Sequence, residues 1–236
     1  MTHTDKNLPI TLSLLAQAID HTLLKPTLIE SELKILCEEA RAHQFKTVCI
    51  PPTWVKQAVN FLTGSSVQVI TVVGFPLGYS HTRSKCLEAE IAISEGATEI
   101  DMVLNISFLK SGRFQEMGED VRNVKRVCDA LPLKVILETA YLTDTEKVEA
   151  AKICERAGAD FIKTSTGFAT GVSITGATLA DIVLLRKNLK PTTQIKASGG
   201  VRDLKSAQEF LQAGANRLGT SSGVQILSGL TASGTY

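Results

Sequence analysis

Residues 156–162 read RAGADFI, and the same pattern returns as SEGATEI at 94–100 and as QAGANRL at 212–218. In each copy a stretch with helical spacing ends at a glycine, and a strand-like run begins soon afterwards. Glycine is typical of a helix end, because it adopts the left-handed backbone conformation without a steric penalty. The pattern therefore predicts a helix followed directly by a strand at three places along the chain.

Working outward from these sites, we find eight short runs with strand-like composition, each followed by a helical pattern. The predicted strands are residues 18–22, 47–50, 67–74, 99–105, 133–139, 160–165, 193–198 and 217–222. Most of these runs are apolar on both faces, as expected for strands of a parallel sheet that helices cover. In residues 143–159, Thr143 and Glu146 have the spacing of a capping box at a helix start.

Alternation of strands and helices predicts an α/β fold with a parallel sheet. Eight such units can close into a (β/α)8 TIM barrel, which typically needs about 250 residues. The 236 residues therefore predict one TIM-barrel domain over 1–236, with a short flexible N-terminus and C-terminal tail. An open doubly wound sheet is the alternative, but it would place a glycine-rich turn after the first strand, where this chain has HTLLKPT at 21–27.

The composition sets limits on partners and compartment. Hydrophobic residues make up 44% and charged residues 21% of a chain whose formal net charge is +1. We therefore expect neither nucleic acid nor a membrane as a partner. Five scattered cysteines without a CxxC pair argue against a disulfide framework and suit a reducing cytoplasm. Four histidines without metal-site spacing predict no metal and no cofactor.

Charged side chains lie toward the C-terminal ends of several predicted strands, which is the end of a barrel where such enzymes do their chemistry. Lys163 and Lys196 occupy matching positions on consecutive strands, and Asp101 interrupts an apolar run. Two ammonium groups in one cavity disfavour each other, so the pKa of one should fall. A neutral lysine can attack a carbonyl and form a Schiff base. The alternative is that each lysine forms a structural ion pair with Asp101 or Glu138.

Three clusters of glycine and serine end the last three strands: TSTGF at 164–168, SGGV at 198–201 and GTSSG at 219–223. The loops after the late strands of a barrel often bind phosphate, through backbone N–H groups and hydroxyls. The clusters therefore indicate a phosphate site. His21 could act as a base beside Asp20, but a histidine at a strand end is more often structural.

The chain resembles the deoxyribose-phosphate aldolases, a family of class I aldolases. The resemblance spans residues 18–223 and is most specific in IDHTLLKP at 19–26, IKTSTGF at 162–168 and KASGG at 196–200. It implies a TIM barrel that reversibly cleaves 2-deoxy-D-ribose 5-phosphate to D-glyceraldehyde 3-phosphate and acetaldehyde. Lys163 matches the Schiff-base lysine of the family, Lys196 the lysine that perturbs it, and Asp101 the acid/base that works through water.

The resemblance also implies the ligand contacts and leaves some points open. The phosphate positions are Gly167, Gly199, Gly200, Ser221 and Ser222, and the sugar site is lined by Asp20, Thr22 and Leu24. Phe168 stands where some members carry a lysine, and the terminal Tyr236 has a possible proton-relay role. The expected partners are a sugar phosphate and acetaldehyde, with a homodimer as one assembly. The open alternatives are another Schiff-base aldolase with a larger donor and a non-catalytic sugar-phosphate-binding barrel.

Overall fold

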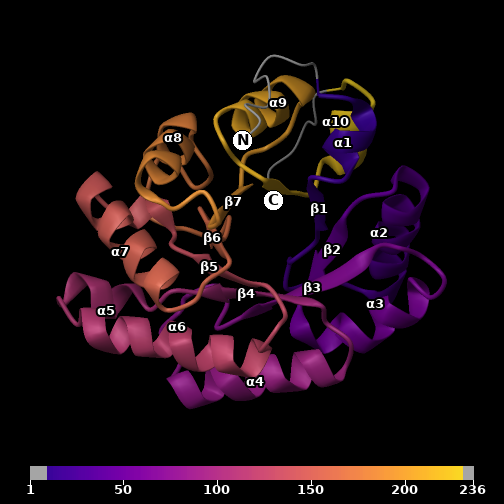
Figure 1. Cartoon of the computed structure of the whole chain (residues 1–236). Helices are drawn as coiled ribbons and strands as arrows, with labels where there is room; N and C mark the ends of the chain where they lie inside the picture. The colour runs from indigo at the N-terminus through magenta and orange to yellow at the C-terminus, as the bar shows by residue number, and fades with distance from the viewer. Residues whose placement is uncertain (1–9, 231–236) are drawn as a thin grey trace.

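Eight parallel strands close into a barrel in the order β1 to β8, with β8 paired to β1 (Figure 1). The computed structural model describes residues 10–230, so the expected flexible ends, including Tyr236, lie outside the described residues. The prediction of a TIM barrel is confirmed, and the alternative prediction of an open doubly wound sheet is wrong. No helix within 10–230 is long and apolar enough to cross a membrane.

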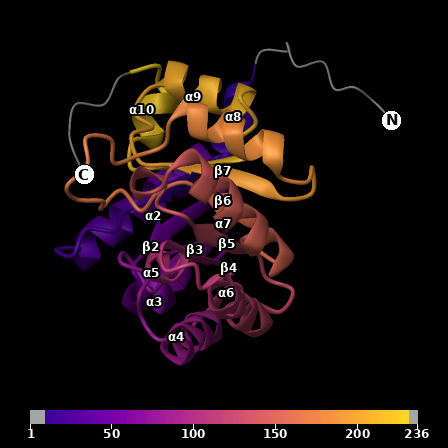
Figure 2. The same ribbon diagram turned by 90° about the vertical axis from the view of Figure 1, so that its left-hand side faces the viewer.

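The strands are short, and helices surround them (Figures 1 and 2). The strands are β1 (Ile19–Thr22), β2 (Thr47–Ile50), β3 (Gln68–Val73), β4 (Glu99–Val103), β5 (Leu133–Ile136), β6 (Phe161–Lys163), β7 (Gln194–Ser198) and β8 (Arg217–Thr220). The helices are α1 (Leu12–Ala16), α2 (Glu30–His43), η1 (Pro52–Trp54), α3 (Val55–Phe61), α4 (Thr82–Ser94), α5 (Ile106–Lys110), α6 (Phe114–Cys128), η2 (Thr139–Tyr141), α7 (Asp144–Arg156), α8 (Leu179–Asn188), α9 (Leu204–Gln212) and α10 (Gly223–Leu227).

The glycine pattern that opened the sequence analysis marks helix ends as predicted. Gly96, Gly158 and Gly214 follow α4, α7 and α9 with φ values of +106°, +100° and +113°. The capping box of α7 is also present, because Thr143 Oγ1 accepts from Glu146 N and Glu146 Oε2 accepts from Thr143 N. Local signals in the sequence therefore set where each of these helices starts or stops.

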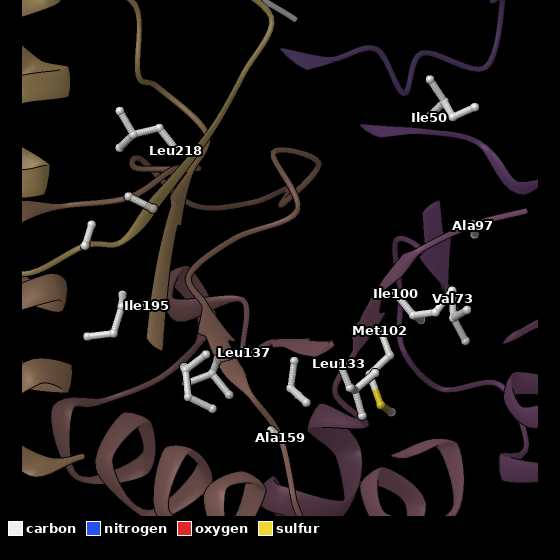
Figure 3. Packing of buried hydrophobic residues seen from close by; sticks show 14 of the residues in the cluster. Ile50, Val73, Ala97, Ile100, Met102, Leu133, Leu137, Ala159, Ile195 and Leu218 are labelled. Atoms are coloured by element: carbon white, nitrogen blue, oxygen red, sulfur yellow. The ribbon is translucent and has the colours of Figure 1, made fainter. Parts of the chain in front are cut away.

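The main hydrophobic core lies between the strands and the surrounding helices. Figure 3 shows part of it, with Ile100 and Met102 of β4, Ile195 of β7 and Leu218 of β8 among the labelled side chains. Each of these four side chains is fully buried. Burying apolar surface of this kind is the main contribution to the free energy of folding. The core therefore packs the helices against the outer face of the barrel, and other side chains fill the barrel interior.

The prediction that most strands are apolar on both faces needs correction, because the charged residues alternate with the core residues. On β4, Ile100 and Met102 belong to the outer core, whereas Glu99 and Asp101 join charged groups inside the barrel. Side chains of a strand point alternately to opposite faces. Four- and five-residue strands show too few repeats for this alternation to stand out in the sequence.

Five strands end earlier than predicted. β3 ends at Val73 rather than 74 and β4 at Val103 rather than 105. At the other three strands the chain turns where polar side chains begin to make hydrogen bonds. β5 ends at Ile136 rather than 139, β6 at Lys163 rather than 165, and β8 at Thr220 rather than 222. After β6, Thr164 Oγ1 donates to Ser198 O at 3.2 Å and accepts from Ser198 N at 3.1 Å. These side-chain bonds replace the regular ladder and form the loops at the barrel mouth.

Candidate active site

Lys163 and Lys196 lie side by side inside the barrel, with Asp101 between them. The two lysines are register partners on the adjacent strands β6 and β7, as the sequence predicts. Asp101 Oδ2 lies 2.9 Å from Lys163 Nζ and 2.8 Å from Lys196 Nζ. All three side chains are almost completely buried. Strand register therefore brings two amines within hydrogen-bonding distance of the same carboxylate.

Six charged side chains form a closed cycle of ion pairs, which we call the charge ring. Its members are, in order, Asp20, Lys196, Asp101, Lys134, Glu99 and Arg217. Lys196 Nζ lies 2.6 Å from Asp20 Oδ2, and Lys134 Nζ lies 3.1 Å from Asp101 Oδ1. Arg217 closes the cycle by pairing with both Asp20 and Glu99. Lys163 is attached to the charge ring through Asp101.

The charge ring keeps Asp101 and Lys196 ionised although both are buried. Burial alone would raise the pKa of Asp101, but the ammonium groups of Lys134, Lys163 and Lys196 outweigh it and hold that pKa well below its usual range. Burial alone would lower the pKa of Lys196, but the carboxylates of Asp101 and Asp20 outweigh it and raise that pKa above the usual value. Asp101 is therefore a carboxylate and Lys196 an ammonium group at neutral pH.

The remaining sugar-site residues named by the resemblance also lie at the barrel interior. Asp20 is a member of the charge ring, and Thr22 Oγ1 donates to Asp20 O at 2.8 Å. Leu24 belongs to a small apolar cluster, separate from the main core, which also contains Cys49, Ile70, Val72, Phe75 and Phe168. The ring of Phe168 stands edge-on to Phe75 at 5.3 Å between centroids. Phe168 is thus part of an apolar wall.

The three glycine and serine clusters meet at the barrel mouth. Gly167, Gly199 and Gly200 all have positive φ, between +77° and +86°. A Cβ on Gly199 would lie 2.8 Å from Gly176 Cα and 3.8 Å from Gly167 Cα, so the loops after β6 and β7 are in close contact. Such an approach is open only to glycine.

The loop after β8 contributes one exposed and one buried serine. Ser221 is exposed and Ser222 is buried. Ser222 N donates to Thr220 Oγ1 at 2.9 Å, which orients the turn into α10. The predicted phosphate residues are thus on neighbouring loops, and their contact with phosphate stays a prediction.

Glu138, which the sequence suggested only as an ion-pair partner of the lysines, fastens the loop after β6. Glu138 accepts hydrogen bonds from Thr166 N, at 3.1 Å, and from Thr166 Oγ1. It does so in the left-handed region, with φ of +56°, which is uncommon for a residue other than glycine. Burial raises the pKa of Glu138, and the bonds from Thr166 only partly offset this. Glu138 therefore binds a loop rather than a lysine, so of the two partners that the ion-pair alternative offered, only Asp101 pairs with Lys163 and Lys196.

Three other charged residues of the site were not predicted from the sequence, namely Glu99, Lys134 and Arg217. Each begins or nearly begins a strand, and Glu99 lies two residues before Asp101. The signal that could have found them is the period of two, since residues two apart on a strand share a face. A charged residue two positions before Asp101 was therefore a candidate for the same cavity.

His21 plays no part in the charge ring. His21 Nε2 lies 2.7 Å from Glu39 Oε2 on α2, and its ring packs on Phe45, which fits the structural interpretation. All five cysteines are free. Within residues 10–230 no group of three or more His, Cys, Asp or Glu side chains is arranged to hold a metal ion.

Comparison with known proteins identifies the family. The profile of the DeoC/LacD family aldolases matches residues 14–229. The deoxyribose-phosphate aldolase of Brevibacillus brevis is 52% identical over 217 residues, which cover 92% of this chain and 96% of that protein. The structure of the aldolase QR15 superposes with a TM-score of 0.86 at 40% identity, covering 91% of this chain and 94% of that one.

A third relative is the deoxyribose-phosphate aldolase of Aeropyrum pernix, whose structure is described as a unique tetramer. It superposes with a TM-score of 0.82 at 32% identity and covers 92% of this chain and 91% of its own. The chain is therefore an aldolase of the DeoC/LacD family, and thus a lyase. Its full-length relatives in that family are deoxyribose-phosphate aldolases, and the chain belongs with them.

Proposed function

We propose that this enzyme is a class I aldolase that reversibly cleaves 2-deoxy-D-ribose 5-phosphate to D-glyceraldehyde 3-phosphate and acetaldehyde, with Lys163 as the Schiff-base lysine. The observation that carries the proposal is the contact of Lys163 and Lys196 with one oxygen of Asp101. One carboxylate oxygen cannot satisfy two buried ammonium groups equally well. Lys196 also pairs with Asp20, so the less supported amine is that of Lys163.

The reaction begins at the amine of Lys163. The neutral amine attacks C1 of the open-chain aldehyde and forms a carbinolamine. Asp101 moves protons through a water molecule, so that the carbinolamine loses water and becomes a protonated imine. Lys196 keeps Asp101 ionised and in place for this transfer. These three residues are the catalytic residues of the proposal.

The protonated imine then acts as the electron sink, so the mechanism needs no metal and no other cofactor. A base removes the proton of the C3 hydroxyl, the C2–C3 bond breaks, and its electron pair forms an enamine on Lys163. Glyceraldehyde 3-phosphate leaves with the new carbonyl. Protonation of the enamine at C2 and hydrolysis of the imine release acetaldehyde and restore the amine.

Substrate binding is proposed from the placement of the glycine loops and of the side chains around the charge ring. The phosphate group binds at the loops of Gly167, Gly199, Gly200, Ser221 and Ser222, which fixes the sugar chain. Asp20 and Thr22 lie on the sugar side, while Leu24 and Phe168 form the apolar wall. Because Phe168 supplies no charge, phosphate relies mainly on backbone N–H groups and hydroxyls. The small apolar wall suits a donor as short as acetaldehyde.

Physiologically, this reaction belongs to deoxyribonucleotide catabolism. We expect the enzyme in the cytoplasm, where its free thiols suit the reducing conditions. A homodimer stays an expectation for the assembly.

Reductive trapping tests the proposal directly. The protein is incubated with acetaldehyde and borohydride, and the modified peptide is identified by mass spectrometry. We expect a reduced ethyl adduct on Lys163, no turnover in Lys163→Ala, and unchanged turnover in the presence of EDTA. Lys205→Ala is a matched control, because that lysine side chain is 85% exposed on α9.

Other results would change the proposal in defined ways. An adduct on Lys196 would exchange the roles of the two lysines. Trapping only with a larger ketone or aldehyde donor would point to a different Schiff-base aldolase. Folded protein that binds sugar phosphate but forms no adduct with any donor would support the binding-only barrel.

A further inference from the structure

The charge ring is complete without Lys163. Lys134 pairs with Glu99 and Asp101, Lys196 with Asp101 and Asp20, and each carboxylate of the ring likewise contacts two cations. Arg217 pairs with Asp20 and Glu99 and closes the cycle. Three carboxylates alternate with three cations, so the fully ionised ring has no net charge. Burying a network of paired charges that sum to zero costs much less free energy than burying a network with an excess charge.

Lys163 would upset this balance if it were protonated. Its one ion-pair partner in the part of the chain described is Asp101, through the oxygen that Lys196 also contacts. A protonated Lys163 would therefore bring a fourth cation to three carboxylates. Within this network the positive charge is held least firmly at Lys163, because every other cation contacts two carboxylates.

We infer that Glu99, Lys134 and Arg217 are positioning residues of the reaction, which close the charge ring so that Lys163 is the group left as a free amine. The inference rests on the proposed function, since it concerns the protonation of the proposed Schiff-base lysine. Glu99 lies two residues before Asp101 on β4, and Lys134 is the register partner of Asp101 on β5. Both therefore act on Lys163 through Asp101.

The other titratable groups that face Lys163 are on different elements. Glu138 follows β5 and interacts electrostatically with Lys163, as does the thiol of Cys49 on β2. Burial raises the pKa of both groups. Glu138 is bound by Thr166. Neither group belongs to the charge ring, so substitutions of Glu99 and Lys134 leave both in place.

Substitutions of opposite charge provide the test. The rate of reductive trapping of acetaldehyde on Lys163 is measured against pH for the wild type, for Lys134→Met, for Glu99→Gln and for the double variant. Lys134→Met leaves a net negative ring that favours ammonium at Lys163, so the midpoint of the profile should move to higher pH. Glu99→Gln leaves a net positive ring, so the midpoint should move to lower pH.

The double variant removes one charge of each sign, so its midpoint should return close to that of the wild type. A shift of about one pH unit in Lys134→Met changes the trapping rate on the acid side about tenfold. A purely structural role for Glu99 and Lys134 would reduce the rate or the melting temperature without displacing the midpoint in opposite directions. Lys134→Arg keeps the positive charge and should keep the wild-type midpoint.

The outcomes separate this inference from the proposed function. Suppose that Lys163 forms the adduct in every variant. If the midpoint of the pH profile is then the same in all of them, or moves in the same direction in both single variants, the inference alone is overturned. The lack of any Lys163 adduct at all pH values overturns the proposed function and this inference with it. If Lys134→Met fails to fold, Glu99→Gln still decides, because a midpoint that stays or rises contradicts the charge argument.

Discussion

Lys163 and Lys196 meet at a single oxygen atom, because Oδ2 of Asp101 lies 2.9 Å from one Nζ and 2.8 Å from the other. The two lysines differ in their remaining partners, since Lys196 also lies 2.6 Å from Asp20. The same residue type therefore meets two environments on neighbouring strands. One environment offers two carboxylate partners, and the other offers one that is already shared.

Lys196→Ala should reduce turnover and move its pH profile upward. Without Lys196, Asp101 is left to pair with Lys163, so the ammonium form of Lys163 is favoured and neutral amine appears only at higher pH. We expect a loss on the order of 10²-fold at neutral pH with partial recovery in alkali, as is typical when proton transfer is impaired. Steady-state kcat against pH measures this, with Lys205→Ala as control. A lower kcat with an unshifted profile would contradict the explanation.

Gly219→Ala should impair catalysis by displacing Lys196. A Cβ at Gly219 would lie 2.9 Å from Ser198 Cβ and 3.0 Å from Lys196 Cε, so the lysine must move. A shift of this kind in a catalytic site can cost up to about 10²-fold in rate. We expect kcat to fall while the circular dichroism spectrum of the protein is retained.

The control for this substitution is Gly118→Ala on α6. Its added Cβ would meet Ile153 Cγ2 at 3.2 Å, in the outer core and away from the lysines. We expect an effect on melting temperature and none on kcat. Equal kcat in both variants would show that Lys196 tolerates the displacement.

Glu138→Ala should weaken binding of the sugar phosphate more than it affects trapping of acetaldehyde. The substitution removes both hydrogen bonds that hold Thr166, and with them the position of the neighbouring Gly167. Losing bonds of this kind costs about 1–3 kcal/mol, so KM for deoxyribose 5-phosphate should rise about tenfold. Steady-state kinetics and the rate of Lys163 trapping are measured on the same preparations.

The matched control is Glu149→Ala, because Glu149 lies on α7 with 47% of its side chain exposed. Tyr141→Phe should give an intermediate rise in KM, since it loses the bonds between Tyr141 Oη and Thr170 farther along the same loop. An unchanged KM in Glu138→Ala would mean that the loop holds its shape without that carboxylate.

The free energy of unfolding should fall as the solution becomes acidic. Burial would raise the pKa of Asp20 and Asp101, but the surrounding cations outweigh it and lower both. Aspartates of the unfolded chain take up protons near pH 4, whereas these two do so only at lower pH. Below about pH 4 the unfolded state therefore binds more protons, and the stability due to these groups is progressively lost.

Urea unfolding at several pH values measures this effect. The stability from Asp20 and Asp101 should be complete above about pH 5 and decline below about pH 4. Asp20→Asn should be destabilised already at neutral pH, by about 3–5 kcal/mol, because it leaves Lys196 and Arg217 short of a partner. The free energy of unfolding of Asp20→Asn should also change less with pH in acid than that of the wild type. A wild-type stability that stays level down to strong acid would contradict the argument.

Most of the fold followed from local signals. Gly96, Gly158 and Gly214 each end a helix, as the repeated pattern predicted. The eight strands lie within or close to the runs predicted from the sequence. Their alternation with helices correctly predicted the barrel. Strand ends were less well predicted, because side-chain bonds such as that of Thr164 to Ser198 end the ladder early, and such bonds join residues far apart in sequence.

The sequence by itself determined that two lysines occupy matching positions on neighbouring strands and that an aspartate could lie between them. Only the tertiary structure decided the rest of the charge ring. Arg217 reaches Asp20 across 197 positions and Glu99 across 118, and both contacts exist because β8 closes against β1. Barrel closure is a long-range event that no local pattern contains, whereas strand and helix propensities act between near neighbours. The chain thus encodes its elements locally, while closure of the barrel completes the charge ring.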